Sequence, residues 1–281
     1  MALQQLPPPG PAWAGSLMGT AIFASLCHTH GLEVVAWAAL FFSLGVLVVL
    51  VTGWLRYRVP GWDSGAMAPW GMVAMGVMSL GSASTAIVGD PVWQHAGWWI
   101  GAPLAWAVCV TQLRQFPGEP TFQWGLALVA PMVAATTAGQ LDGRFYHAAG
   151  VASFFLTLCT AIPVFAYCYN EGFHGRLNVP DRLGGTTWIP LGVGPVLFAG
   201  QRFARSVLRW AEYGPGWWGA TFPVGALSLG AHVLSTSTGW VWLDVVSQAL
   251  LGLTALHIVL CVARFSQWVA QDRPRTVVAP P

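Results

Sequence analysis

The sequence predicts an all-α polytopic membrane protein in which nine to ten transmembrane helices form inner and outer helical hairpins around a central pore. Two observations predict this fold class. Of the 281 residues, 55% are hydrophobic and only 8% are charged, whereas about a quarter of the residues in a soluble domain are charged. In addition, apolar runs close to the ~20 residues that cross a bilayer as a helix recur along the whole chain.

The apolar runs are of two kinds that alternate. Runs marked by proline and rich in small residues suit helices that pack closely or border a narrow lumen, whereas runs of bulky side chains suit helices that face lipid. The first kind covers residues 11–29, 67–89, 122–139, 186–200 and 217–235, and the second covers residues 33–55, 93–113, 146–169 and 240–265. We therefore expect five inner helices around a central path, shielded from lipid by the outer helices.

The segment after residue 200 departs from this alternation. Only thirty residues lie between Thr186 and Trp217, and two crossings with a turn need more than about forty residues. Arg202, Arg205 and Arg209 favour a basic interfacial helix over a membrane span. The outer helix expected here is either missing or compressed, so the sequence predicts nine crossings and leaves the tenth open.

The transmembrane bundle is expected to cover residues 11–266, with its region 201–216 shortened. Residues 1–10 form a proline-rich N-terminal tail that lacks the basic start of a signal peptide, so we expect the first helix to be retained. Residues 267–281 form a C-terminal tail, which is expected to be cytoplasmic.

Arginine placement predicts the orientation of the bundle. Arg56 and Arg58 follow the second predicted helix and Arg114 follows the fourth, whereas the loops after the first and third contain no arginine. By the positive-inside tendency, the N-terminus lies in the cytoplasm of a multi-pass protein of the cell (plasma) membrane.

The composition argues against several classes of function. The net charge of +2 comes from arginine alone because the chain has no lysine, and it does not favour nucleic acid as a partner. The five cysteines stand singly in apolar runs, so neither a disulfide framework nor a metal site is expected. The chain has no P-loop, no GxSxG motif and no pair of carboxylates, so we expect no enzyme activity and no cofactor.

The segment 217–230 is the most informative of the inner runs. It has two tryptophans at its start, a Phe222–Pro223 step inside it and small residues along one face. Proline removes a backbone donor and loosens the preceding turn, and the ring of Phe222 is expected at that point. The segment is either a pore-lining helix with Phe222 as the gate of the pore, or a kinked helix whose only role is to pack against its neighbouring helices.

Anion passage needs favourable electrostatics without a fixed charge that traps the ion. The predicted inner helices carry no charged residue in their central parts, so attraction is expected from backbone dipoles near prolines and from hydroxyl groups. With Phe222 as the pore gate, the pore-lining candidates are Gly19, Thr20, Ser82, Pro131, Thr136, Pro190, Thr221, Pro223 and His232.

Three further ionisable residues lie near or inside the last two predicted helices. His232 follows Phe222 by ten residues, close to three helical turns, and either borders the path or lies at the helix end. Asp244 and His257 are on the bulky outer helix, where hydrogen bonding between helices is the favoured interpretation.

Five short motifs together resemble the tellurite-resistance/dicarboxylate transporter family. They are Met-Gly-Thr-Ala-Ile at residues 18–22, Ala-Pro at 68–69, Ala-Pro-Met-Val-Ala-Ala at 130–135, Trp-Ile-Pro-Leu-Gly at 188–192 and Trp-Trp-Gly-Ala-Thr-Phe-Pro at 217–223. Each motif lies on a predicted inner helix, and the resemblance covers nearly the full length. The family includes a bacterial tellurite-resistance protein, plant slow-type anion channels, malic-acid permeases and sulfite efflux pumps.

The resemblance implies ten helices arranged as five hairpins around a pore, assembled as a homotrimer. It also implies transport of small anions of the C4-dicarboxylate, sulfite, chloride or nitrate class, with Phe222 as the residue that occludes the pore. The sequence departs from the family in the region 201–216, which is short for the eighth helix of the family.

Two alternatives to anion transport stay open. The shortened region suggests a transport-inactive membrane scaffold subunit. The histidines suggest a haem or metal oxidoreductase of the membrane, which would use His28, His30, His95, His147 and His257. Haem sites in helical bundles need histidines deep in facing helices, whereas the first four of these lie at predicted helix ends.

Overall fold

Eight α-helices form most of the part of the chain that the computed structural model describes, which is residues 10–63, 65, 67–174, 201, 204–205 and 207–271. They are α1 (Ala14–Thr29), α2 (Glu33–Tyr57), α3 (Met67–Val88), α4 (Val92–Arg114), α5 (Phe122–Ala138), α6 (Arg144–Phe173), α9 (Thr221–Thr238) and α10 (Val241–Gln271). The 3-10 helices η1 (Gly10–Trp13) and η3 (Pro215–Ala220) precede α1 and α9. No β-strand occurs among the described residues.

The all-α prediction is confirmed, but the predicted number of nine to ten helices is not. The inner helix expected over residues 186–200 lies outside the described residues, and so does most of the segment before Ala204. The last helix, α10, continues to Gln271 and therefore extends beyond residue 266, where the bundle was expected to end.

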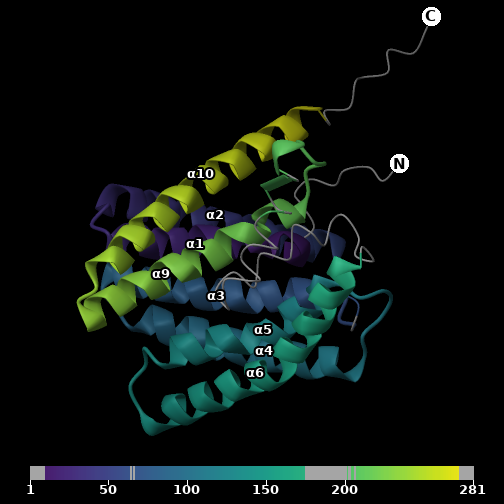
Figure 1. Ribbon diagram of the computed structural model, residues 1–281, viewed down its shortest axis with the longest axis horizontal. Helices are drawn as coiled ribbons and strands as arrows, with labels where there is room; N and C mark the ends of the chain where they lie inside the picture. The colour runs from purple at the N-terminus through teal and green to yellow at the C-terminus, as the bar shows by residue number, and fades with distance from the viewer. Residues whose placement is uncertain are drawn as a thin grey trace, which may run out of the picture.

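Neighbouring helices pack as hairpins, as the alternation of the sequence predicts. The pairs are α1 with α2, α3 with α4, α5 with α6 and α9 with α10 (Figure 1). The first helices of these pairs also contact one another, in the order α9, α1, α3, α5. The inner helices thus pack directly against each other through their small residues, and the second helices cover them.

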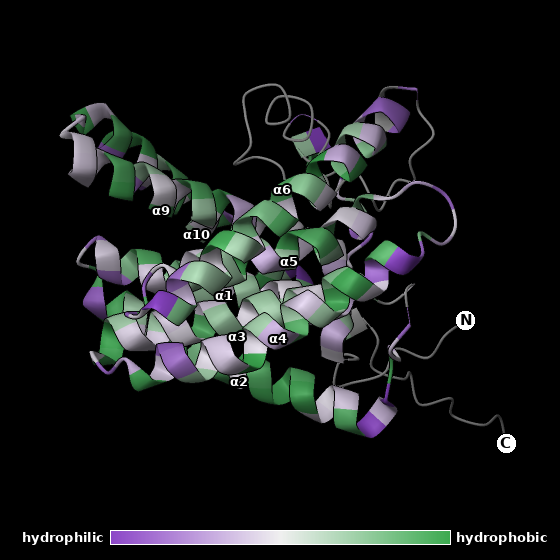
Figure 2. Ribbon diagram, turned by 90° about the horizontal axis from the view of Figure 1, so that it is seen from below, coloured by the Kyte–Doolittle hydropathy of each residue, from purple (hydrophilic) through white to green (hydrophobic). Residues whose placement is uncertain are grey.

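Burial separates the inner from the outer helices. Twelve of the sixteen residues of α1 are buried, whereas only six of the 25 residues of α2 are buried. The exposed residues of α2 include Phe41 and Val48, and its ribbon is mostly in the hydrophobic colour (Figure 2). Such an exposed apolar face suits contact with lipid. Four helices, α2, α3, α6 and α10, are long and apolar enough to cross a membrane.

The Phe222–Pro223 step was expected to loosen a turn inside a helix, but it lies at the start of α9. The α-helix begins at Thr221, after the 3-10 turns of η3, so Pro223 lies in its first turn. Proline is tolerated there because the first backbone N–H groups of a helix have no intrahelical acceptor. The loosened turn expected before Pro223 is therefore the beginning of the helix rather than a break within it.

Glycines allow the backbones of α3 and α4 to approach closely. A Cβ atom added to Gly81 would lie 2.6 Å from the carbonyl oxygen of Trp93 and 3.1 Å from Cα of Gly97. Both of these atoms belong to the backbone of α4 and cannot move away as a side chain could. Gly81 therefore sets the distance between the two helices.

Replacement of Gly81 by alanine is expected to lower the unfolding temperature in detergent, because the methyl group forces α3 and α4 apart at a cost of roughly 1–3 kcal/mol. Gly252 of α10 is the matched control, since an added Cβ there has no neighbour within 4 Å. Gly252→Ala should leave the unfolding temperature unchanged or raise it, because alanine favours a helix over glycine by about 1 kcal/mol. Equal effects of the two substitutions would contradict the packing described for Gly81.

Candidate functional site

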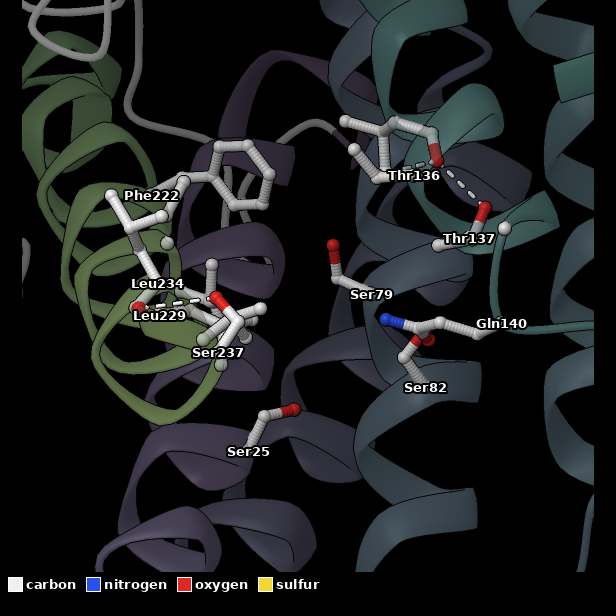
Figure 3. Close-up of a pocket in the computed structure, with 16 residues that line it drawn as sticks. Ser25, Ser79, Ser82, Thr136, Thr137, Gln140, Phe222, Leu229, Leu234 and Ser237 are labelled. Carbon is white, nitrogen blue, oxygen red and sulfur yellow. Dashed lines mark hydrogen bonds between the residues drawn. The ribbon is translucent and has the colours of Figure 1, made fainter. Parts of the chain in front are cut away.

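A cavity of about 680 Å³ lies between the inner helices α1, α3, α5 and α9. Its wall includes Ser25 of α1, Ser82 of α3, Thr136 of α5 and Ser237 of α9 (Figure 3). Four different helices thus contribute a hydroxyl group to the same space. A concave site with an apolar wall and a few polar groups is the usual form of a ligand-binding cavity.

A second cavity, of about 240 Å³, lies next to the first along the helix axes. On α1, Met18 lines the smaller cavity, and Ser25, two turns further along, lines the larger one. The smaller cavity is therefore nearer the N-terminal end of α1, and the larger cavity is nearer its C-terminal end.

Phe222 lies where the two cavities meet. Its side chain lines both of them, as do those of Val133, Thr136 and Ala226. Figure 3 shows the ring of Phe222 directed away from α9 into the space that α5 and α3 face. The ring also packs against the buried cluster that contains Met18 and Met75. A single aromatic side chain thus lies between two spaces that follow one another along the bundle.

The position of Phe222 follows from how the first turn of α9 is held. Thr221 is fully buried and its hydroxyl donates to the carbonyl of Trp218 (2.7 Å). Gly19 of α1 faces Thr221 so closely that a Cβ atom on Gly19 would overlap the threonine hydroxyl. Because Thr221 is directed to α1, the next side chain along the helix, Phe222, points to a different side.

No charged residue of the described part of the chain lines either cavity. The polar atoms of the larger cavity belong to hydroxyl groups and to Gln140. Several of the hydroxyl groups donate to backbone carbonyls of their own helix, as Thr136 does to Val133 (3.0 Å) and Ser237 to Leu234 (3.1 Å). In contrast, the hydroxyl oxygen of Ser82 is buried and has no hydrogen-bond partner among the described residues.

Gln140 is a second available donor, and sequence reasoning missed it. The amide nitrogen of Gln94 donates to the carbonyl of Thr137 (3.0 Å) and to Oε1 of Gln140 (2.7 Å). Because a backbone carbonyl can only accept, these bonds fix the orientation of both amides. The nitrogen of Gln140 is then free to face the cavity, and Figure 3 shows it directed into the space between the helices. The sequence did contain an indication of this polar contact, since Gln94 is a polar amide inside an otherwise apolar run.

The structure brings some of the sequence-predicted residues together and separates others. Ser82 and Thr136 line the larger cavity with Phe222, and Pro223 lines the smaller one. Thr20 is buried and its hydroxyl donates to Ser16 of the same helix (2.8 Å). The remaining candidates do not line either cavity: Gly19, Pro131 and Thr221 are buried in the helices, and His232 lies elsewhere, while Pro190 lies outside the described residues.

The ionisable groups of α9 and α10 make contacts between helices. Nδ1 of His232 is 3.0 Å from Oδ1 of Asp244, and Nε2 of His257 is 2.7 Å from the carbonyl oxygen of Trp217. Two other histidines have different partners: His28 contacts Glu33 and His95 contacts Tyr146, both at 3.0 Å. These separate contacts do not favour the haem alternative, which needs two histidines on facing helices.

The comparison with known families agrees with this arrangement of apolar helices around cavities that no charged residue of the described chain lines. A family model described as a voltage-dependent anion channel matches residues 10–211 of the chain. The chain belongs to the voltage-dependent anion channel family. This is the tellurite-resistance/dicarboxylate transporter family that the sequence motifs resemble. No curated protein and no solved structure matches the chain.

Membership of the voltage-dependent anion channel family, together with the apolar helices, makes this a multi-pass membrane protein. The matched residues include all of α1 to α6. They therefore contain the cavity walls formed by α1, α3 and α5, whereas α9 with Phe222 follows the matched region.

A cysteine that replaces Thr136 is expected to react with a water-soluble thiol reagent, because Thr136 is exposed to the larger cavity. The matched control is Thr20→Cys, which should stay unreactive because Thr20 is only 1% exposed. Both variants are made in a Cys159→Ser background, since Cys159 is the exposed cysteine of the chain. Equal labelling of the two variants, measured by mass spectrometry, would contradict a water-filled cavity at Thr136.

Proposed function

We propose that this protein carries small anions across the membrane through the two cavities, which the inner helices line together with α6, and that the ring of Phe222 occludes the path. The observation that carries this proposal is that Phe222 lines both cavities. The family match supports anions as the transported species. Removal or rotation of one ring would join two spaces that already follow one another along the bundle.

The uncharged wall suits passive passage of an anion. A fixed positive charge in a narrow path holds an anion strongly, whereas neutral donors replace part of its hydration shell and still let it leave. The hydroxyl of Ser82 and the amide of Gln140 are neutral donors of this kind, and both residues line the larger cavity. We expect an anion to stop briefly at these two groups before it reaches Phe222.

The same neutral wall favours monovalent anions such as chloride or nitrate over C4-dicarboxylates and sulfite. The cost of taking an ion out of water rises with the square of its charge in the Born description, and opposite charge normally offsets that cost. No arginine, lysine or histidine of the described chain lines the cavities. A dianion would therefore lose much more hydration than Ser82 and Gln140 can replace.

Gating in this proposal is a motion of one side chain. Thr221 and Pro223, the neighbours of Phe222, are buried, and Thr221 is held against α1. The backbone at Phe222 therefore stays in place while the ring rotates about its side-chain bonds. An apolar ring in a narrow passage also hinders water from bridging the two cavities, which adds to the barrier for an ion.

The family resemblance and the arginine pattern extend the proposal to assembly and location. We propose that the protein acts as a homotrimer in the cell membrane with its N-terminus in the cytoplasm. The exposed apolar residues of the outer helices, such as Phe41 of α2 and Phe155 of α6, then face lipid or a neighbouring subunit.

Phe222→Ala is expected to raise anion flux into lipid vesicles several-fold, because the ring that separates the two cavities is removed. The measurement is chloride or nitrate uptake by vesicles that contain equal amounts of purified protein. The matched control is Phe41→Ala on the exposed face of α2, which should leave flux unchanged. If neither wild-type protein nor Phe222→Ala conducts any anion, the transport-inactive scaffold replaces the proposed function.

Ser82→Ala is expected to lower anion flux several-fold in a Phe222→Ala background, because one of the two cavity donors is lost. The unfolding temperature should stay nearly unchanged, since the hydroxyl of Ser82 has no partner to lose among the residues that the structure describes. The matched control is Ser25→Ala, whose hydroxyl lines the same cavity but lies 3.5 Å from a carbonyl of its own helix. Equal flux in the two variants would contradict a donor role for Ser82.

A further inference from the structure

Three ionisable residues from three different elements meet at the end of the bundle away from η3. His30 follows the last residue of α1, His232 lies near the end of α9, and Asp244 lies in the first turn of α10. Figure 1 shows the turn between α9 and α10 at this end. Each residue offers one ligand atom, and the three atoms lie within 4.8 Å of one another.

We propose that His30, His232 and Asp244 bind a divalent transition-metal ion, with Zn²⁺ as the best match. Two imidazoles and one carboxylate are a ligand set that Zn²⁺ commonly takes, with water in the fourth position. Hard cations such as Ca²⁺ and Mg²⁺ prefer oxygen ligands only and suit this set poorly.

The distance between the ligand atoms of His232 and Asp244 is close to that of a tetrahedral site. Nδ1 of His232 is 3.0 Å from Oδ1 of Asp244, and tetrahedral ligands at zinc distances of about 2.0–2.1 Å are about 3.3 Å apart. The rings of His30 and His232 have centroids 5.0 Å apart and are inclined at 71°. The ligand atom of His30 lies within 4.8 Å of the other two, and binding would draw it closer to both.

A second layer of hydrogen bonds prepares His30 to bind. The hydroxyls of Ser228 and Ser247 donate to each other's backbone carbonyls, at 2.7 and 2.8 Å. The proton of the Ser247 hydroxyl is thereby used, so its oxygen accepts from Nε2–H of His30, 3.0 Å away. In a neutral imidazole this leaves the lone pair on Nδ1, and such fixing of the tautomer is typical of histidines that bind metals.

The carboxylate ligand is supported in a similar way. The amide nitrogen of Gln248 donates to Oδ2 of Asp244 (2.9 Å), which leaves Oδ1 for the ion.

Metal binding would change the tautomer of His232. Without the ion, the Nδ1–H of His232 donates to Oδ1 of Asp244. The ion forms bonds to Nδ1 and Oδ1, and the ring proton of the neutral imidazole is then carried by Nε2, with no net release of a proton. The ion then ties α9 and α10 to the end of α1. None of the three residues lines either cavity, so this site does not depend on the proposed anion path.

The test is a calorimetric titration of Zn²⁺ into the purified full-length protein in detergent. Wild-type protein should bind one Zn²⁺ per chain and unfold at a higher temperature when Zn²⁺ is present. His232→Gln and Asp244→Asn should each weaken binding at least about tenfold and lose the rise in unfolding temperature. His28→Gln is the matched control, because His28 is a neighbouring histidine that pairs with Glu33 instead, and it should bind Zn²⁺ like the wild type.

Cobalt(II) gives a second measurement that does not rely on stability. Its visible absorption bands should show four-coordinate nitrogen and oxygen ligation in the wild type and in His28→Gln, and should be lost in His232→Gln. The proposal is overturned if the wild type binds no Zn²⁺. It is also overturned if His232→Gln and Asp244→Asn bind Zn²⁺ as tightly as the wild type, or if His28→Gln abolishes binding.

Discussion

The contact between Gly19 of α1 and Thr221 of α9 determines where the functional side chain lies. The absence of a Cβ atom on Gly19 lets the buried Thr221 approach α1. Thr221 also bonds to Trp218 of η3, so the first turn of α9 is held from two sides. Phe222 is the next residue, and its ring is therefore directed into the space between the inner helices. A larger residue at position 19 would shift α9 and the ring with it.

The hydrogen bonds of the cavity wall leave only a few donors for an ion. In a bundle without charged residues at its centre, most hydroxyls bond to their own backbone, which is the nearest acceptor. Ser82 and Gln140 are different for separate reasons: the first has no partner among the described residues, and the second is turned by Gln94 so that its nitrogen faces the cavity. A neutral wall with few available donors is consistent with an anion that passes rather than one that stays bound.

The sequence predicted the helices well because glycine, proline and charge mark the ends of the apolar runs. The second run was expected over residues 33–55, and α2 covers Glu33–Tyr57. Contacts between distant residues could not be predicted, as with Gln94 and Gln140, which are 46 positions apart. His232 was also difficult to place: at about 100° per residue, ten residues bring its direction about 80° away from that of Phe222. It therefore faces α10 and meets Asp244.

The central claim is that Phe222 separates two cavities of one path, and reagent access across the ring tests it most directly. Met132 of α5 is partly buried, and it lines the smaller cavity and not the larger one. A cysteine at this position would be reached, through the path, by a membrane-impermeant thiol reagent added from the side of the larger cavity. The account predicts slow labelling of Met132→Cys when Phe222 is present and much faster labelling when Phe222 is replaced by alanine. Equal labelling rates in the two proteins would contradict it.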